Sequence, residues 1–407
     1  MKKFLHIIRK FFKWFFITLV SLIVIGCLVI IISGRWYIFK AVACTYLVGQ
    51  TGPGILDRNF FPEREIKNSL TPQPWEEHGH FGKLSLNDVQ TEKLETYKTT
   101  SYMVFKDDKI IFEKYFEEFD ESTVSNSFSM AKSFVSLLIG IAIEEGKIKS
   151  VDQPVGDFVE SFREGKKGEL TLRHLLTMSA ALNWSESGGN PFSDNAEAYY
   201  GSDLEGMIND MEVEGEPGKT FNYQSGATLV LGYIIEKATG KKLSEYASEK
   251  LWQPLGAEHP AFWSLDKEDG IEKSYCCWYA TGRDFARIGK MMLHNGKWND
   301  TPIVPEEYVK QSITPAPLLK EDGSPNDKYG FSWWLLKYKN MEVFYARGIL
   351  GQYIICLPEK NTIVVRTGHK RGVKKINDHP ADVFDYIDIA LELTAAVPDM
   401  EKNEKRY

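Results

Sequence analysis

An uncharged, strongly apolar stretch at residues 14–34 constrains this chain more than any other feature. Phe, Ile, Leu and Val dominate it, and it is about as long as a helix must be to cross a bilayer. Five basic residues and no acidic one precede it: Lys2, Lys3, Arg9, Lys10 and Lys13. Basic flanks of a span remain in the cytoplasm. We therefore predict a cytoplasmic tail at 1–13, a transmembrane anchor at 14–34, and a remainder outside the inner (plasma) membrane.

Two forms of processing compete with an uncleaved anchor. A signal peptide has a shorter apolar core and a small-residue cleavage site. Residues 24–27, ending at Cys27, loosely resemble the cleavage box of a lipoprotein. However, residues 28–32 continue the apolar run past that cysteine. We therefore predict an uncleaved signal-anchor, with a lipoprotein at Cys27 as the alternative.

The composition is that of a globular protein rather than a nucleic-acid-binding one. The chain has 407 residues, of which 26% are charged and 43% hydrophobic, and its net charge is -7. It can bury a large core. No basic patch interleaved with aromatics is present, so we expect no nucleic-acid partner. No Gly-x-Gly-x-x-Gly turn or phosphate-binding loop is present either, so we expect no cofactor.

Metal and disulfide chemistry are also not expected. His78 and His80 are neighbours, but no third ligand follows at a metal-site spacing. Adjacent Cys276 and Cys277 are not expected to bond to each other, because the small ring they would close is strained. We predict no disulfide framework, and cysteine usage does not decide the redox compartment.

The rest of the chain divides into a connector, one domain and a tail. Turn-forming Gly and Pro residues mark 35–95 as a juxtamembrane connector. A domain at 96–397 follows, and 398–407 is a charged tail. Within the domain we predict a hairpin at 102–112 near the start and strands at 329–338, 341–346, 352–357 and 362–367 near the end. Between them we predict helices at 127–145, 170–176 and 285–293, and a last helix follows at 383–395. This order predicts one α/β (α+β) domain whose sheet pairs both ends of the chain.

The chemistry centres on Ser129 and Lys132, which open the largely apolar run 134–143. Residues three apart lie on one face of a helix. A serine hydroxyl needs a base beside it to act as a nucleophile. A lysine in an apolar pocket can be that base, because desolvation favours the neutral amine. Backbone N–H groups at the helix N-terminus can stabilise an oxyanion. The alternative is a helix cap followed by a solvated lysine.

Two later motifs favour the catalytic interpretation. Tyr223-Gln224-Ser225 precedes the apolar stretch 229–235, which places Tyr223 on a loop that enters a helix. Ala-Arg-Gly-Ile-Leu-Gly-Gln at 346–352 lies at a turn onto a late strand. With Ser-x-x-Lys, these resemble the three ordered motifs of serine β-lactamases, penicillin-binding proteins and their esterase relatives. Four further segments are similar to landmarks of the class C branch: 172–178, 279–287, 296–298 and 303–305.

The resemblance covers about residues 100 to 395 and is nearest to hydrolases of the 6-aminohexanoate-dimer type and to family VIII esterases. It implies an antiparallel sheet with an inserted, mostly helical region. It implies that Ser129 forms an acyl-enzyme, with Lys132 and Tyr223 as base and proton relay. The oxyanion donors would be the backbone N–H groups of Ser129 and Ile349.

The same resemblance implies a set of substrate-binding residues: Trp184, Ser225, Gly348 and Gln352. Ser225 is also expected to cap its helix. The third motif departs from the family, because Ala346 stands where related enzymes have a lysine or histidine. Arg347 is adjacent, but neighbours on a strand point to opposite faces. An ester or a linear amide is therefore the expected small-molecule substrate.

Two alternatives remain. One is a D-Ala-D-Ala carboxypeptidase or β-lactamase. The other is a non-catalytic receptor on the same fold, although a binding module has no need of Ser129, Lys132 and Tyr223 together.

Overall fold

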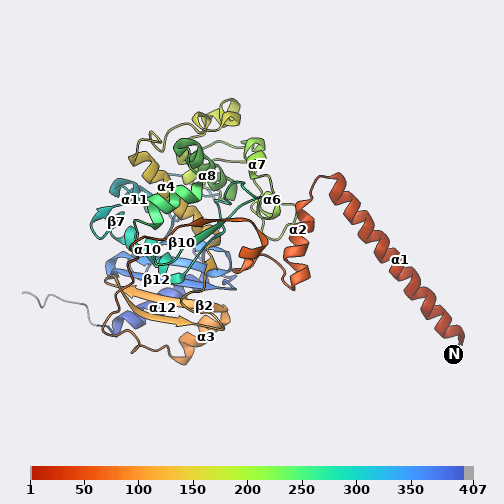
Figure 1. Ribbon diagram of the computed structural model, residues 1–407, viewed down its shortest axis with the longest axis horizontal. Coiled ribbons are helices and arrows are strands. Elements are labelled where there is room, and N and C mark those ends of the chain that lie inside the picture. Colours follow the sequence, from red (N-terminus) through yellow and green to blue (C-terminus); the bar gives the residue numbers. More distant parts are fainter. Residues whose placement is uncertain (1, 398–407) are drawn as a thin grey trace, which may run out of the picture.

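The structure is a computed structural model that describes residues 2–397. Its N-terminal helix α1 (Lys2–Ile32) stands out from the folded domain (Figure 1). This helix is long and apolar enough to cross a membrane. The predicted basic tail forms its first turns, and the helix ends two residues before the predicted end of the span. The predicted tail 398–407 lies outside the described residues.

A six-stranded antiparallel sheet joins both ends of the domain, as predicted. Its strand order is β3-β2-β12-β11-β10-β9, so early strands pair with late ones. The strands are β2 (Thr99–Lys106), β3 (Lys109–Tyr115), β9 (Trp334–Tyr338), β10 (Met341–Gly348), β11 (Gln352–Leu357) and β12 (Thr362–Gly368). The predicted hairpin is β2–β3, and β9 is shorter than the predicted strand at 329–338.

Helices cover both faces of this sheet (Figure 1). Gly289 of α10 (Gly282–Leu293) lies against Ile354 and Cys356 on one face. Tyr386 of α12 (Ala381–Ala395) accepts a hydrogen bond at its backbone oxygen from Tyr102 and packs on Tyr353 on the other face. Successive strand residues point to opposite faces, which explains why Tyr353 and Ile354 meet different helices.

The inserted region between β3 and β9 is mostly helical. Its helices are α4 (Ala131–Glu144), α5 (Leu172–Leu176), α6 (Asp194–Tyr200), α7 (Leu204–Asp210), α8 (Ser225–Thr239), α9 (Leu243–Ala247), α10 and α11 (Glu306–Ser312). Short 3-10 or π turns occur at Phe128–Met130 (η3), Val155–Asp157, Glu160–Phe162, Gly165–Glu169 and Ser248–Trp252. The buried helices α4 and α8 pack on each other and form the centre of this region.

Residues 35–95 are more than a connector. They contain α2 (Tyr37–Cys44), η1 (Tyr46–Val48), η2 (Asp57–Phe60), β1 (Glu63–Ile66) and α3 (Asp88–Thr96). Strand β1 is part of a second antiparallel sheet with the order β1-β5-β6-β4. The other strands of that sheet are β4 (Ser125–Asn126), β5 (Ala261–Ser264) and β6 (Trp278–Ala280). Because Ile55, Phe61 and Ile66 are buried in the core, this segment packs with the domain and does more than link it to helix α1.

Four short strands and two turns complete the described chain. The strands are β7 (Lys297–Trp298), β8 (Thr301–Pro302), β13 (Lys375–Ile376) and β14 (His379–Pro380), and the 3-10 turns are η8 (Ile349–Gly351) and η9 (Pro358–Lys360).

Candidate active site

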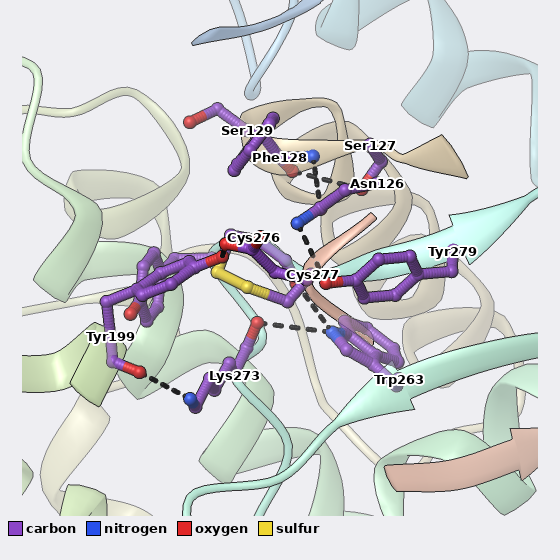
Figure 2. Close-up of a disulfide and its surroundings, with 12 residues drawn as sticks. Asn126, Ser127, Phe128, Ser129, Tyr199, Trp263, Lys273, Cys276, Cys277 and Tyr279 are labelled. Atoms are coloured by element: carbon purple, nitrogen blue, oxygen red, sulfur yellow. Dashed lines mark hydrogen bonds between the residues drawn. A yellow bond between two sulfur atoms is a disulfide. The ribbon is translucent and has the colours of Figure 1, made fainter. Parts of the chain in front are cut away.

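Ser129 lies in the tight turn η3, immediately before α4. Phe128 has a left-handed backbone conformation (φ 43°), which costs free energy for a bulky residue and is typical of functional sites. Its N–H donates to the side chain of Asn126 at 2.8 Å, and the N–H of Ser127 donates to the carbonyl of Trp278 at 2.8 Å. The turn that presents Ser129 is therefore held from strands β4 and β6, as Figure 2 shows.

Lys132 extends from the first turn of α4 and is almost completely buried. Its Nζ donates to the Oγ of Ser129 at 3.0 Å and to the backbone carbonyl of Tyr275 at 2.9 Å. The Ser-x-x-Lys spacing thus brings the hydroxyl and the amine together, and a distant segment fixes the amine in place. A solvated lysine is incompatible with this burial.

Tyr223 completes a cluster of three polar groups. It precedes α8, and the centroid of its ring lies 5.1 Å from the Nζ of Lys132. The ring packs on Trp334 with centroids 5.5 Å apart and meets Tyr329 edge-on at 6.1 Å. Burial raises the pKa of Tyr329 well above its usual value, so this neighbour stays neutral at ordinary pH. Tyr223 is therefore oriented by aromatic packing rather than by an ion pair.

The structure corrects one expectation beside this cluster: Cys276 and Cys277 form a disulfide (Figure 2). Both residues are buried, and Cys277 has a positive φ of 65°. The indole of Trp263 donates to the carbonyl of Cys276 at 2.8 Å. Packing supplies the constraints that overcome the unfavourable small ring. The bonded pair directly follows Tyr275, whose carbonyl binds Lys132.

Ser225 does not cap its helix. It is the first residue of α8, after Gln224, and its hydroxyl donates to Glu186 at 2.7 Å. The second oxygen of Glu186 accepts from the backbone N–H of Ser225 at 2.7 Å and from the indole of Trp184 at 2.9 Å. A carboxylate at a helix N-terminus is electrostatically favourable. Ser225 and Trp184 are thus bound to Glu186, with Trp184 packed over the start of α8 at Gly226.

The third motif lies where β10 passes η3. A Cβ on Gly348 would lie 2.2 Å from the backbone oxygen of Ser127, so only glycine allows this approach. Ile349 follows in the turn η8, with its side chain partly exposed. Gln352 is fully buried, and its amide donates to the carbonyls of Ile349 and Gly368 at 3.2 and 2.7 Å. Gln352 therefore holds the turn and has no side-chain surface for substrate.

Arg347 reaches the site indirectly. By strand alternation it lies on the face of β10 opposite to Ala346 and Gly348. Its guanidinium carbon nevertheless stacks 3.5 Å from the ring centroid of Trp334, which packs on Tyr223. A cation therefore contacts the indole that packs on Tyr223, although Ala346 itself is buried and apolar.

Sequence reasoning missed the partners of Lys132, Ser225 and Tyr223. Tyr275 contributes a backbone carbonyl, which any residue carries, so no sequence signal identifies it. The chain contains many acidic and aromatic residues, and nothing in the sequence distinguishes Glu186 or Trp334 from the others. Among residues 2–397, no cluster of three or more His, Cys, Asp or Glu side chains is placed to hold a metal.

Comparison with known proteins identifies the family. The model of the beta-lactamase family matches residues 90–382, which is most of the chain. The chain belongs to this family. Its curated relatives include a 6-aminohexanoate-dimer hydrolase from Paenarthrobacter ureafaciens, 24% identical over 292 residues, covering 68% of this chain and 74% of that protein. Esterase EstB from Burkholderia gladioli is 29% identical over 161 residues, covering 36% of this chain and 41% of that protein.

Solved structures show the same beta-lactamase fold. The structure named "Putative 6-aminohexanoate-dimer hydrolase from Bacillus anthracis" superimposes with a TM-score of 0.71 and 24% identity, and the match covers 84% of this chain and 93% of that one. The relatives are hydrolases, so the protein is an enzyme of the serine hydrolase class with amidase and esterase relatives. The predictions of family and fold are confirmed.

Proposed function

We propose that the protein is a membrane-anchored serine hydrolase that cleaves an ester or a linear amide through an acyl-enzyme on Ser129. One observation carries this proposal: the buried amine of Lys132 lies 3.0 Å from the Ser129 hydroxyl, with the Tyr223 ring beside it. The apolar helix α1 supports the anchor. The basic flank orients the domain outside the cytoplasm, and disulfides persist in that environment.

The chemistry follows from this geometry. In the neutral amine the contact is reversed: the Ser129 hydroxyl donates to Nζ of Lys132, and its oxygen attacks the acyl carbonyl. The proton passes from Lys132, directly or through the Tyr223 phenol, to the leaving alcohol or amine. The N–H groups of Ser129 and Ile349 bind the oxyanion, and each such donor contributes about 3 kcal/mol. Water then attacks the acyl carbon, and the bond from that carbon to the oxygen of Ser129 breaks. The proton of the water passes through Tyr223 or Lys132 to the Ser129 oxygen, and the carboxylic acid leaves.

The test is turnover of a chromogenic short-chain ester by the full chain in detergent. We expect Ser129→Ala to abolish turnover and to abolish covalent labelling by a fluorophosphonate, while the thermal unfolding midpoint is unchanged. Wild-type activity in this variant would disprove the mechanism. Wild-type protein that neither turns over esters and amides nor reacts with the probe would instead indicate a non-catalytic receptor.

A second candidate, a D-Ala-D-Ala carboxypeptidase or β-lactamase, draws support from Arg347. Its guanidinium, stacked on the indole of Trp334 that also packs on Tyr223, is the type of cation that binds a substrate carboxylate. Labelling with a fluorescent penicillin distinguishes this candidate. Labelling that requires Ser129 and is lost in Arg347→Gln would favour it. An ester hydrolase that does not react with penicillin and tolerates Arg347→Gln would exclude it.

A further inference from the structure

The segment after α1 has an apolar face that nothing in the domain covers. Helix α2 packs on α6 and buries its side chains Tyr37, Ile38 and Cys44 in the domain. The charged end of Lys40 turns inward, 4.6 Å from the ring centroid of Phe61. The side of α2 and η1 that faces away from the domain carries only uncharged, exposed side chains. Leu47, for example, is 77% exposed. Its large members are Trp36, Val42, Tyr46, Leu47 and Val48.

This exposed set, here called the α2–η1 face, is unfavourable in water. A surface helix of a globular protein normally carries polar or charged side chains on the face turned away from its core. A contiguous exposed apolar patch marks a partner or a membrane surface. Trp and Tyr are the side chains enriched at the membrane–water interface, where an apolar ring and a polar edge are both satisfied.

The position of the face identifies its occupant. Helix α1 ends at Ile32, and α2 begins at Tyr37 after a turn at Gly34, whose φ is positive. A face so close to the end of a span lies at bilayer level. We propose that the α2–η1 face lies in the membrane–water interface and holds the catalytic domain on the bilayer. This inference rests on the proposed anchoring by α1.

The docked segment is connected to the candidate active site. The hydroxyl of Tyr37 donates to the carbonyl of Pro191 at 3.1 Å, and Arg35 lies over the ring of Phe192 at 5.3 Å. Phe192 is itself exposed. The same loop begins near Glu186, which binds the N–H of Ser225, two residues after Tyr223. Docking of α2 therefore also places the loop 185–194, which borders the site, next to the lipid headgroups.

The test uses the full chain in vesicles of phosphatidylethanolamine and phosphatidylglycerol. The environment-sensitive fluorophore NBD is attached to Leu47→Cys in a Cys27→Ser background, because Cys44 and Cys356 are buried and Cys27 is not. Lipids with a doxyl quencher near the headgroup are then added. We expect at least about two-fold quenching and a blue-shifted emission, as for a group at the headgroup boundary. Leu70→Cys and Val373→Cys, 94% and 96% exposed, are matched controls that should not be quenched.

Each other outcome is distinguishable. NBD on the native Cys27 of α1 reports on the span through chain-depth quenchers. If that probe is quenched while position 47 behaves like position 70, the docking inference is overturned and the anchor stands. If the Cys27 probe is not quenched, the anchor and the docking are both wrong. A position-47 signal that depends on protein concentration rather than on lipid would mean that a second copy covers the face. Turnover of a soluble ester by the labelled protein reports separately on the hydrolase.

Discussion

The amine of Lys132 lies 2.9 Å from the backbone carbonyl oxygen of Tyr275, which belongs to the segment leading into β6. The same amine contacts Ser129 at 3.0 Å. A backbone carbonyl accepts a hydrogen bond but is too weak a base to be protonated at ordinary pH. In the proposed mechanism it therefore orients the amine and does not compete for the proton that Ser129 gives up. In the proposed mechanism Lys132 therefore has one partner that reacts, Ser129, and one that positions it, the Tyr275 carbonyl.

Removal of this amine should cost activity but little folding. We expect Lys132→Met to lower kcat/KM for a short-chain ester about 10²–10⁴-fold, which is the usual contribution of a positioned proton-transfer group. Methionine fills most of the same apolar space, so the unfolding midpoint should stay near that of the wild type. Lys337→Met, at an exposed surface lysine, is the control and should retain full activity. Equal activity in the two variants would contradict a role for Lys132.

The disulfide beside Tyr275 should matter for rate. A dithiol reduces the bond, giving thiols at Cys276 and Cys277 and a cyclic disulfide of the reagent. We expect kcat to fall about ten-fold or more, because a displacement of about 1 Å at a catalytic group can cost up to about 10²-fold. The double variant Cys276→Ala/Cys277→Ala should have low activity and no response to the dithiol.

Thiol titration of the denatured protein provides the necessary check on that experiment. The count should rise from three free thiols to all five cysteines after reduction. Full activity with five free thiols would show that the disulfide does not position the Tyr275 carbonyl.

Gly348 should tolerate no side chain. In Gly348→Ala the new Cβ would lie 2.2 Å from the Ser127 oxygen, and β10 or η3 must move apart. Overpacking of this kind typically costs about 1–3 kcal/mol. The displacement would occur at the turn that presents Ser129, so kcat should fall as well. Gly79→Ala, where no atom lies within 4 Å of the new Cβ, is the matched control. Similar kinetics for both variants would exclude the close approach.

Stability should depend on pH through His379. Burial, reinforced by the nearby cation Arg347, lowers the pKa of His379 from 6.5 to about 4. Its Nδ1 shares a hydrogen bond of 2.6 Å with the hydroxyl of Tyr345. Between these two pKa values the unfolded chain binds a proton that the folded chain does not. Stability is therefore fully present above pH 6.5 and decreases as the pH falls towards 4, by on the order of 3 kcal/mol.

Denaturant unfolding above and below pH 6.5 measures this effect. His379→Gln keeps an acceptor for Tyr345 but does not titrate, so its pH dependence should be smaller than that of the wild type. Parallel curves for the two proteins would show that other groups cause the acid sensitivity.

Local patterns predicted several of the elements, because each of these depends on neighbours in the chain. The apolar run after Lys132 predicted α4, and strands at both ends predicted a sheet that pairs the two ends of the domain, which the structure shows to have six strands. The helices and the strand within 35–95 were not predicted. This segment does contain many turn-forming residues, but its side chains Ile55, Phe61 and Ile66 are buried in the core by residues distant in the sequence. Such contacts leave no periodic signal.

The sequence by itself identified the candidate reacting groups, since Ser129, Lys132 and Tyr223 are recognisable by type and order. Only the tertiary structure decided their environment: the Tyr275 carbonyl on the amine, the bond between Cys276 and Cys277, and Glu186 as the partner of Ser225. The physical reason is that a side chain's chemistry is encoded in one residue. Its partner depends on which distant backbone or carboxylate the packed core brings within hydrogen-bonding distance.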